Sequence, residues 1–196
     1  MTSFDLRDLE FQLFEVLRAQ ENATGRYADY DRETMAGVLA MAARIAEAEF
    51  LPHAAKSDAN EPRFVDGGVE MIPEIGQALA AYREAGFFGA GFDHELGGMQ
   101  MPETLRGAIG FLFSMADIGI SGYPLLTVAA ANLLAEFGSD EQKQRYLLPL
   151  IEGRWFGTMC LSEPHAGSSL ADITTMARPQ PDGSYAISGR KMWISG

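Results

Sequence analysis

The stretch MCLSEPHAGSSLADI, residues 159–173, places two polar turns between two apolar segments. The first turn is Ser-Glu-Pro-His and the second contains Gly-Ser-Ser, so small hydroxyl side chains and backbone N–H groups gather at one bend. Pro, Gly and Ser favour turns because they restrict or free the backbone and hydrogen-bond locally. The stretch therefore predicts a polar bend between two strands.

Further short segments rich in aromatic and β-branched residues surround this bend. They lie at residues 155–161, 173–177, 184–188 and 191–195. Pro, Asp and Gly separate them, and Pro181-Asp182-Gly183 is a turn signal. This pattern predicts a meander of antiparallel strands. A few strands with an apolar face need further partners, so we expect residues 152–196 to be the start of a β domain that is incomplete in this chain.

Apolar residues recur every three or four positions through much of the chain before residue 151, which predicts a nearly all-helical region. The first strongly periodic helix is expected from an Asp31 N-cap to just before Pro52. Four more helices are expected: from Pro73 to Gly86, after Pro102, from Pro124 to Gly138, and from Ser139, whose spacing to Gln142 is that of a capping box.

Composition limits the classes of function. The chain has 196 residues, 47% of them hydrophobic, which is enough to bury a core. Its formal net charge of -12 disfavours binding to nucleic acid or to an anionic membrane, because phosphate-rich partners require clustered Lys and Arg.

Cysteine usage and the N-terminal sequence indicate a cellular location. Cys160 is the single cysteine, which excludes an internal disulfide or a multi-cysteine metal site and suits a reducing compartment. The first residues are charged and lack the apolar core of a secretory signal, and we expect no membrane-spanning segment. The simplest expectation is a cytoplasmic protein.

The segment GAGFDHELGG, residues 89–98, resembles a dinucleotide-binding fingerprint only in part. His94 occupies the position where a third glycine is required, and no strand-helix-strand unit surrounds it. We therefore expect Gly97 and Gly98 to form a tight structural loop before the next helix.

Other nucleophile and metal motifs are weak. Cys160 and His165 are close in sequence, as a thiol and its base would be, but a small buried residue is the preferred interpretation of Cys160. The segment HAGSSLA lacks the Gly-x-Ser-x-Gly elbow of a serine hydrolase. His53, His94 and His165 have no zinc-ligand spacing, so no metal site is expected.

The bend could instead bind a planar polar ring such as a flavin. It needs hydrogen-bond partners along one edge, an aromatic or apolar wall and few charges nearby. The hydroxyls of Ser162, Ser168 and Ser195 with the Trp193 ring would supply that set. Two ordinary strands with a serine-rich turn explain the same residues, and the pattern alone leaves both interpretations open.

Four motifs in order resemble the FAD-dependent acyl-CoA dehydrogenase family. They are HELGGMQMP, GSDEQKQRYLLPLIEGRWFG, MCLSEPHAGSSLADI and KMWISG, within residues 94–196. The resemblance implies an α+β fold: an N-terminal all-helical domain followed by the first strands of an antiparallel β-barrel domain. It divides the chain into an extension at 1–30, a helical domain at 31–151 and an incomplete β domain at 152–196.

The N-terminal sequence LRDLEFQLFEVLRAQ and the turn SEPHAGSSL are similar to an extended subfamily that includes 3-methylmercaptopropionyl-CoA dehydrogenase. That resemblance implies an acyl-CoA substrate, with 3-methylmercaptopropionyl-CoA as one possibility. It also implies α,β-dehydrogenation of the thioester to a trans-2-enoyl-CoA, with an electron-transfer flavoprotein as acceptor and a homodimer or homotetramer as the full-length assembly.

The resemblance also implies which residues contact FAD. Ser162 would bond the pyrimidine edge, Ser195 would stand in for the usual Thr near the nitrogen that accepts hydride, and Ser168 would also touch the acyl-CoA. The complete expected FAD-contact set is Met159, Cys160, Leu161, Ser162, Ser168, Trp193, Ile194 and Ser195.

Two departures from the family pattern affect these expectations. Ser169 replaces the usual Asp after Gly-Ser, which affects the expected turn and CoA contacts. No residue of this chain matches the family's catalytic Glu, and Glu163 belongs to the flavin turn instead. We therefore expect the chain alone to be inactive, and a non-catalytic helical interaction or ligand-binding module remains the alternative.

Overall fold

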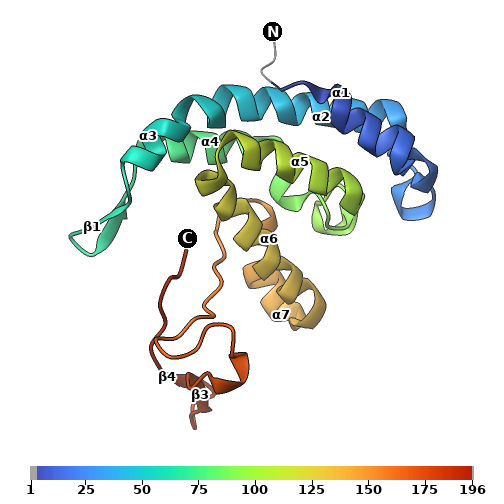
Figure 1. Ribbon diagram of the computed structural model, residues 1–196. Coiled ribbons are helices and arrows are strands. Elements are labelled where there is room, and N and C mark those ends of the chain that lie inside the picture. Colours follow the sequence, from blue (N-terminus) through green and yellow to red (C-terminus); the bar gives the residue numbers. More distant parts are fainter. Residues whose placement is uncertain (1–3, 196) are drawn as a thin grey trace.

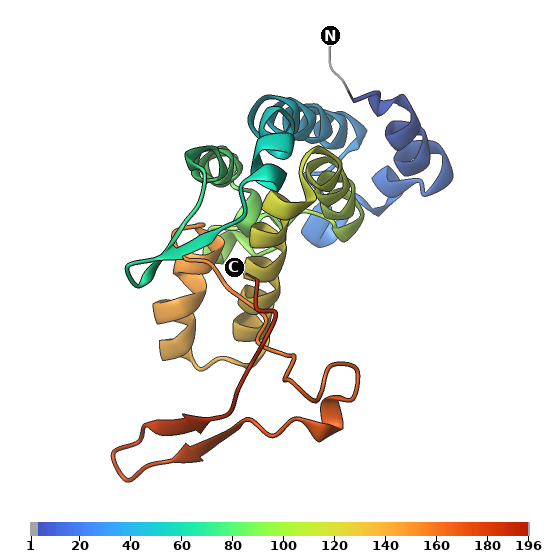
Figure 2. The ribbon, with the colours of Figure 1, turned by 60° about the vertical axis from the view of Figure 1, so that its left-hand side comes forward.

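The computed structural model describes residues 4–195, and these form an α+β fold in which packed helices precede a largely open β segment (Figures 1 and 2). The α-helices are α1 (Leu6–Phe11), α2 (Arg32–Ile45), α3 (Ala54–Ala59), α4 (Pro73–Glu84), α5 (Glu103–Ala116), α6 (Ile118–Phe137), α7 (Asp140–Gln142) and α8 (Leu148–Ile151). Three π-helical segments, η1 (Gln12–Val16), η4 (Ala46–Phe50) and η8 (Lys143–Leu147), continue α1, α2 and α7. The 3-10 turns are η2 (Ala19–Asn22), η3 (Gly25–Tyr27), η5 (Leu51–His53), η6 (Phe87–Gly89), η7 (His94–Leu96) and η9 (Leu170–Asp172).

The predicted helix after Asp31 is confirmed. The Asp31 side chain accepts a hydrogen bond of 2.8 Å from the Thr34 backbone N–H, which caps the N-terminus of α2. Met35, Leu39 and Ala42 are fully buried at the spacing of one helix face. The periodic apolar residues therefore place α2 and η4 against the core.

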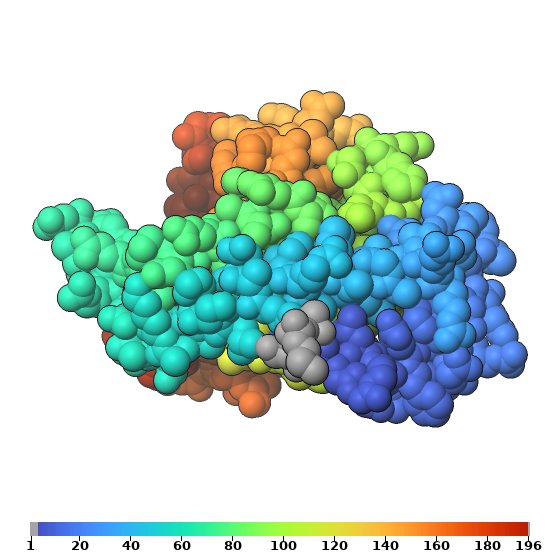
Figure 3. Space-filling model, turned by 90° about the horizontal axis from the view of Figure 1, so that it is seen from above, coloured from blue at the N-terminus to red at the C-terminus, as the bar shows by residue number. Residues whose placement is uncertain are grey.

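An aromatic cluster forms the centre of the helical part. The Tyr82 ring packs against Phe87, Phe88 and Phe113, with ring centroids 5.4, 5.0 and 4.8 Å away. Phe50, from η4, packs 4.8 Å from Phe113. Burial raises the pKa of the Tyr82 hydroxyl to about 12. Helices α2, α4 and α5 thus share one core, and Figure 3 shows the N-terminal helices spread over one face of the molecule.

The predicted start of α6 is wrong. This helix begins at Ile118, one turn and more before Pro124, and the Asp117 side chain caps it by accepting a 3.0 Å hydrogen bond from the Ile120 N–H. Pro124 lies inside the helix, where it removes one backbone donor. At 20 residues, α6 is also long and apolar enough to cross a membrane by length and composition alone, and here it packs against α4, α5 and α8.

The capping box predicted at Ser139 is confirmed. The Ser139 hydroxyl accepts from the Gln142 N–H at 3.2 Å, and the Gln142 side chain accepts from the Ser139 N–H at 2.9 Å. Gly97 and Gly98 also form the tight loop expected of them. Gly97 has a φ of +80°, and a Cβ at Gly98 would lie 2.1 Å from the Phe92 carbonyl oxygen.

A β-hairpin interrupts the helices and contradicts the expectation of a nearly all-helical region. Strands β1 (Arg63–Val65) and β2 (Gly68–Glu70) pair antiparallel, with Val65 opposite Gly68. Asp66 and Gly67 between them both have positive φ, as a type I′ turn requires. The hairpin projects from the helical part in Figures 1 and 2.

The β segment after α8 contains fewer strands than predicted. Strands β3 (Met176–Pro179) and β4 (Tyr185–Ser188) pair antiparallel with Met176 opposite Ser188, and the predicted turn at residues 181–183 joins them. Residues 155–161 and 191–195 are not strands, because only isolated hydrogen bonds link these two segments. The meander is thus one hairpin beside two extended segments.

Candidate functional site

The structure brings the two expected flavin-contact segments side by side. The Met192 N–H donates to the Ser162 carbonyl at 3.1 Å, and the Thr158 hydroxyl donates to the Ser195 carbonyl. We call residues 158–162 the first contact segment and 191–195 the second. Seven of the eight predicted residues lie on these two segments, and Ser168 lies on the turn that follows the first.

Most of the predicted residues present their side chains to solvent. Ser162 is half-buried, whereas the other seven are exposed. The indole of Trp193 is 83% exposed, and the residue has a φ of +59°, which is uncommon for a bulky side chain. Hydroxyl groups and an aromatic face are therefore accessible on the same pair of segments.

The predicted burial of Cys160 is wrong. Its side chain is exposed, because no second layer packs on the first contact segment in the described structure. The His165 imidazole lies 3.2 Å from the Asp172 carbonyl oxygen, and no hydrogen bond joins it to Cys160 within residues 4–195. The arrangement does not assemble a thiol nucleophile with its base.

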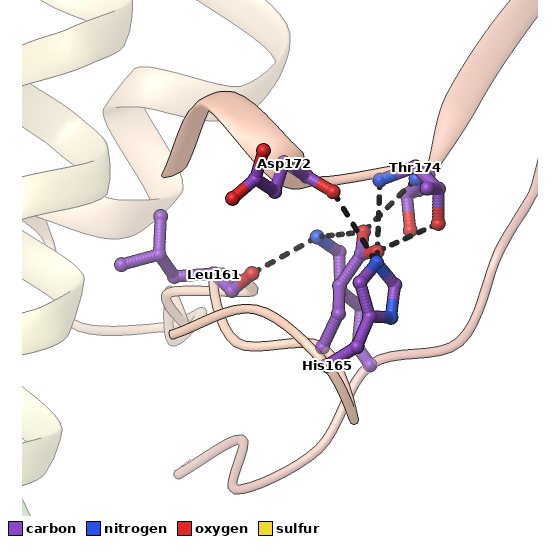
Figure 4. A network of polar contacts seen from close by, with 7 residues as sticks. Leu161, His165, Asp172 and Thr174 are labelled. Atoms are coloured by element: carbon purple, nitrogen blue, oxygen red, sulfur yellow. Dashed lines mark hydrogen bonds and ion pairs between the residues drawn. The ribbon is translucent and has the colours of Figure 1, made fainter. Parts of the chain in front are cut away.

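Glu163 is the buried polar centre of the bend (Figure 4). Its side chain is 1% exposed, and its two oxygens accept four hydrogen bonds of 2.9 Å. The donors are the Thr174 N–H, the Thr174 hydroxyl, the Thr175 N–H and the Lys191 ammonium. An ionised carboxylate has about four lone-pair sites, so this one is saturated.

The surroundings of Glu163 stabilise its charged form. Hydrogen bonds from Thr175, from Thr174 and from the Lys191 ammonium lower the pKa of Glu163 well below its ordinary value, against a desolvation that raises it. A carboxylate that remains ionised and fully hydrogen-bonded is poorly placed to accept a proton from a substrate. Glu163 therefore has the properties of a structural anion.

The sequence pattern missed the partner of Glu163. Lys191 begins the second contact segment, and its ammonium also donates to the Leu161 carbonyl at 3.0 Å. Its side chain is 21% exposed. The available signal was a Lys two residues before Trp193, and nothing in the spacing links it to a residue 28 positions earlier.

The sequence pattern also missed an apolar cavity between α4, α5 and α6. Its volume is about 560 Å³, and Phe113, Ile109 and Val128 contribute to its walls. A Cβ added at Gly107, Gly110 or Gly122 would meet no atom within 4 Å, so these helix glycines leave the space open. Three glycines on two adjacent helices were the signal in the sequence.

Helix α6 connects this cavity to the residues that precede the first contact segment. Pro124 and Val128 of α6 line the cavity, while the Thr127 hydroxyl accepts a 3.1 Å hydrogen bond from the Gly157 N–H. The Phe156 ring packs 6.1 Å from Tyr123 of the same helix. The apolar cavity and the two residues that precede the first contact segment thus lie against one helix.

The chemistry of the two contact segments fits a flavin. The eight predicted residues carry three hydroxyl groups, one exposed indole and no charge. A flavin ring requires hydrogen-bond partners at its edge and an aromatic or apolar wall. Two charged side chains beside the segments, Glu163 and Lys191, are paired with each other at 2.9 Å.

Comparisons with known proteins identify related chains. Residues 32–154 match the family model described as acyl-CoA dehydrogenase, N-terminal domain. The chain is 33% identical over 191 residues to 3-methylmercaptopropionyl-CoA dehydrogenase of Ruegeria pomeroyi, covering 97% of this chain and 32% of that protein. It spans about a third of the length of the curated relatives that it matches first.

Solved structures have the same fold. An acyl-CoA dehydrogenase from Bacillus anthracis complexed with FAD aligns with a TM-score of 0.69 and 26% identity, over 85% of this chain and 27% of that chain. A structure reported for the electron transferring flavoprotein of Acidaminococcus fermentans aligns with a TM-score of 0.69 and 28% identity, over 82% of this chain and 39% of that chain.

Proposed function

Because the chain belongs to the acyl-CoA dehydrogenase family, we propose that the complete protein oxidises an acyl-CoA thioester to the trans-2-enoyl-CoA with FAD as its cofactor. The observation that carries the proposal is the pairing of the two contact segments, through the Met192–Ser162 and Thr158–Ser195 hydrogen bonds. The pairing supports the proposal because seven of the eight residues expected to contact FAD lie on these two adjacent segments.

The residues proposed to hold FAD are those of the two contact segments and the following turn: Met159, Cys160, Leu161, Ser162, Ser168, Trp193, Ile194 and Ser195. FAD would supply a hydride acceptor for the β carbon of the substrate. Ser162 would hydrogen-bond the pyrimidine edge, Ser195 would face the hydride-accepting side, and the Trp193 indole would form a wall.

The substrate is proposed to place its acyl group in the cavity between α4, α5 and α6. The glycines at 107, 110 and 122 keep this space open, and its walls are mainly apolar. Ser168 is proposed to contact the CoA portion. The similarity to the Ruegeria protein supports 3-methylmercaptopropionyl-CoA as the first substrate to test.

The proton of the substrate's α carbon must leave to a base, and we propose no residue of this chain for that role. Glu163 is excluded from that role, because its carboxylate is 1% exposed and saturated with donors. We propose that the base belongs to a part of the protein beyond these 196 residues. The chain alone is therefore expected to be inactive.

Two partners complete the proposal. An electron-transfer flavoprotein would reoxidise the cofactor, which is supported by the similarity to a chain in the Acidaminococcus flavoprotein structure. The complete protein is proposed to act as a homodimer or homotetramer in the cytoplasm.

The decisive experiment uses the complete product of the gene. It would be purified, tested for bound FAD by its visible absorbance, and mixed without oxygen with 3-methylmercaptopropionyl-CoA and with straight-chain acyl-CoAs. We expect bound FAD and bleaching by at least one acyl-CoA. A protein that binds acyl-CoA without FAD would support the non-catalytic module instead, and one that binds neither would contradict both.

A further inference from the structure

Glu163 and Lys191 join the two contact segments more directly than any other pair of charged side chains in residues 4–195. Lys191 starts the second contact segment, and Glu163 follows directly on the first. The ammonium donates to the Glu163 carboxylate at 2.9 Å and to the Leu161 carbonyl at 3.0 Å. The Lys191 ammonium thus binds both the Glu163 side chain and the backbone of the first contact segment.

The Glu163 carboxylate extends this connection to a third element. Its other donors are the backbone and hydroxyl groups of Thr174 and the backbone of Thr175, which lead into β3. Figure 4 shows these contacts converging from the bend and from the chain near Thr174. The bend, the approach to β3 and the second contact segment therefore meet at one carboxylate.

Because the pair is buried, removing one partner while keeping the other is costly. A buried carboxylate requires compensating charge and hydrogen bonds, and removal of one partner leaves the other uncompensated. With Glu163 1% exposed and Lys191 21% exposed, neither group is freely solvated. The pair is consequently sensitive to neutralisation of either member.

The position of Lys191 bears directly on Trp193. Lys191 lies two residues before Trp193. The φ of Trp193 is +59°, outside the extended backbone conformation, and its indole is 83% exposed. Once Lys191 is anchored on Leu161 and Glu163, the point at which this indole emerges is fixed relative to Ser162. Among residues 4–195, the Met192–Ser162 bond is the one backbone–backbone hydrogen bond between the two segments.

We propose that Glu163 and Lys191 are positioning residues that set the spacing between the two flavin-contact segments. The proposal rests on the proposed function, because it assumes that these segments hold FAD. Neither residue contacts the reacting atoms; each acts through the residues that it orients, chiefly Ser162, Trp193 and Ser195.

The test compares variants in the complete product of the gene. Glu163→Gln and Lys191→Met each remove one member, the double variant removes both, and Lys191→Arg keeps the positive charge. Glu152→Gln is the matched control, since Glu152 pairs with Arg154 at 2.5 Å but both are about half exposed and lie outside the two segments. FAD affinity, the absorbance spectrum of bound FAD and the thermal midpoint are measured for each.

We expect Glu163→Gln and Lys191→Met each to weaken FAD binding by about tenfold or more and to shift the flavin spectrum. The double variant should be little weaker than either single variant, because the two residues act as a unit. Lys191→Arg should stay within about threefold of the wild type because it retains the charge and the donors. Glu152→Gln should match the wild type.

Wild-type affinity and spectrum in folded Glu163→Gln would overturn the proposal. So would a lowered thermal midpoint in Lys191→Met with unchanged FAD affinity of the folded fraction, since that is the result of a purely structural role. If both neutral variants fail to fold, Lys191→Arg decides. A folded Lys191→Arg protein with the wild-type spectrum supports the pair, and a folded one whose FAD affinity falls well beyond about threefold, while Glu152→Gln keeps the wild-type affinity, contradicts it. A wild-type protein without FAD affinity refutes the proposed function itself.

Discussion

One residue, Glu163, has a role that its sequence context does not reveal. In sequence it is an acidic residue in a turn, beside a serine, a proline and a histidine, where a catalytic carboxylate would be a natural hypothesis. In the structure it is buried and accepts four hydrogen bonds. We therefore expect ligand contacts at this bend to come from the hydroxyl groups and the indole, while the carboxylate holds the chain.

The pKa of Glu163 predicts a pH dependence of stability. Its folded-state pKa is lowered from the ordinary 4.5, so its contribution is present above pH 4.5 and is lost as the pH falls toward the lowered value. We expect the difference in thermal midpoint between wild type and Glu163→Gln to be largest near neutral pH and to shrink progressively below pH 4.5. Glu152→Gln, which removes an exposed carboxylate outside the two contact segments, serves as control. A difference that is constant from pH 7 to acid would contradict this account.

Two glycines should respond oppositely to alanine. Gly98→Ala places a Cβ 2.1 Å from the Phe92 carbonyl oxygen, a backbone atom that has little freedom to move. We expect it to lower the free energy of unfolding by about 3 kcal/mol. Gly37→Ala, on an exposed face of α2 with no atom within 4 Å, should raise it by about 0.5–1 kcal/mol. Urea unfolding of both variants would measure the contrast, and equal effects would contradict it.

Among the elements, the start of α7 offers a direct test of local sequence control. Ser139→Ala removes the hydroxyl that accepts from the Gln142 N–H, and should cost about 1 kcal/mol of unfolding free energy. Ser139→Asp keeps an acceptor at the same N-cap and should stay close to wild type. Thermal unfolding of the two variants checks the prediction, which fails if Ala and Asp behave alike.

Helices were predictable from the sequence because the spacing of apolar residues and the capping residues indicate the same helix boundaries and buried face. Met35, Leu39 and Ala42 define the face of α2, and Asp31 defines its start. The error at α6 arose because Pro124 was assigned to the first turn, whereas Asp117 supplies a better cap further upstream. A proline inside a helix costs one backbone hydrogen bond, and here packing and the cap compensate.

Strands were less predictable because pairing is set by distant residues. Strands β1 and β2 have three residues each, which is too short to show a period-two pattern. The one sequence signal for this hairpin was the Asp66-Gly67 turn. The two contact segments have the composition of strands, but only isolated hydrogen bonds join them. The juxtaposition of Ser162 with the second segment came from the family resemblance, while the Glu163–Lys191 contact required the structure.

For the molecule as a whole, the cavity predicts how acyl-chain preference should change. Gly110→Leu would fill space that a Cβ alone leaves open, and we expect weaker binding of long acyl-CoAs with FAD affinity unchanged. The expected change in the ratio of long-chain to short-chain kcat/KM is about tenfold or more for the complete enzyme. Gly37→Leu, an exposed helix glycine away from the cavity, is the control. An equal loss for all chain lengths would argue against this cavity as the acyl site.

The projecting β1–β2 hairpin gives the chain a place where it could be divided. Helix α2 precedes the hairpin and α5 follows it, yet the two pack against each other. The hydrophobic core therefore contains residues from both before and after the hairpin. The strands themselves are exposed and Gly67 has open space around it. A cut between Asp66 and Gly67 would therefore separate two pieces that still share one interior, and fragments 1–66 and 67–196 should reassemble when mixed.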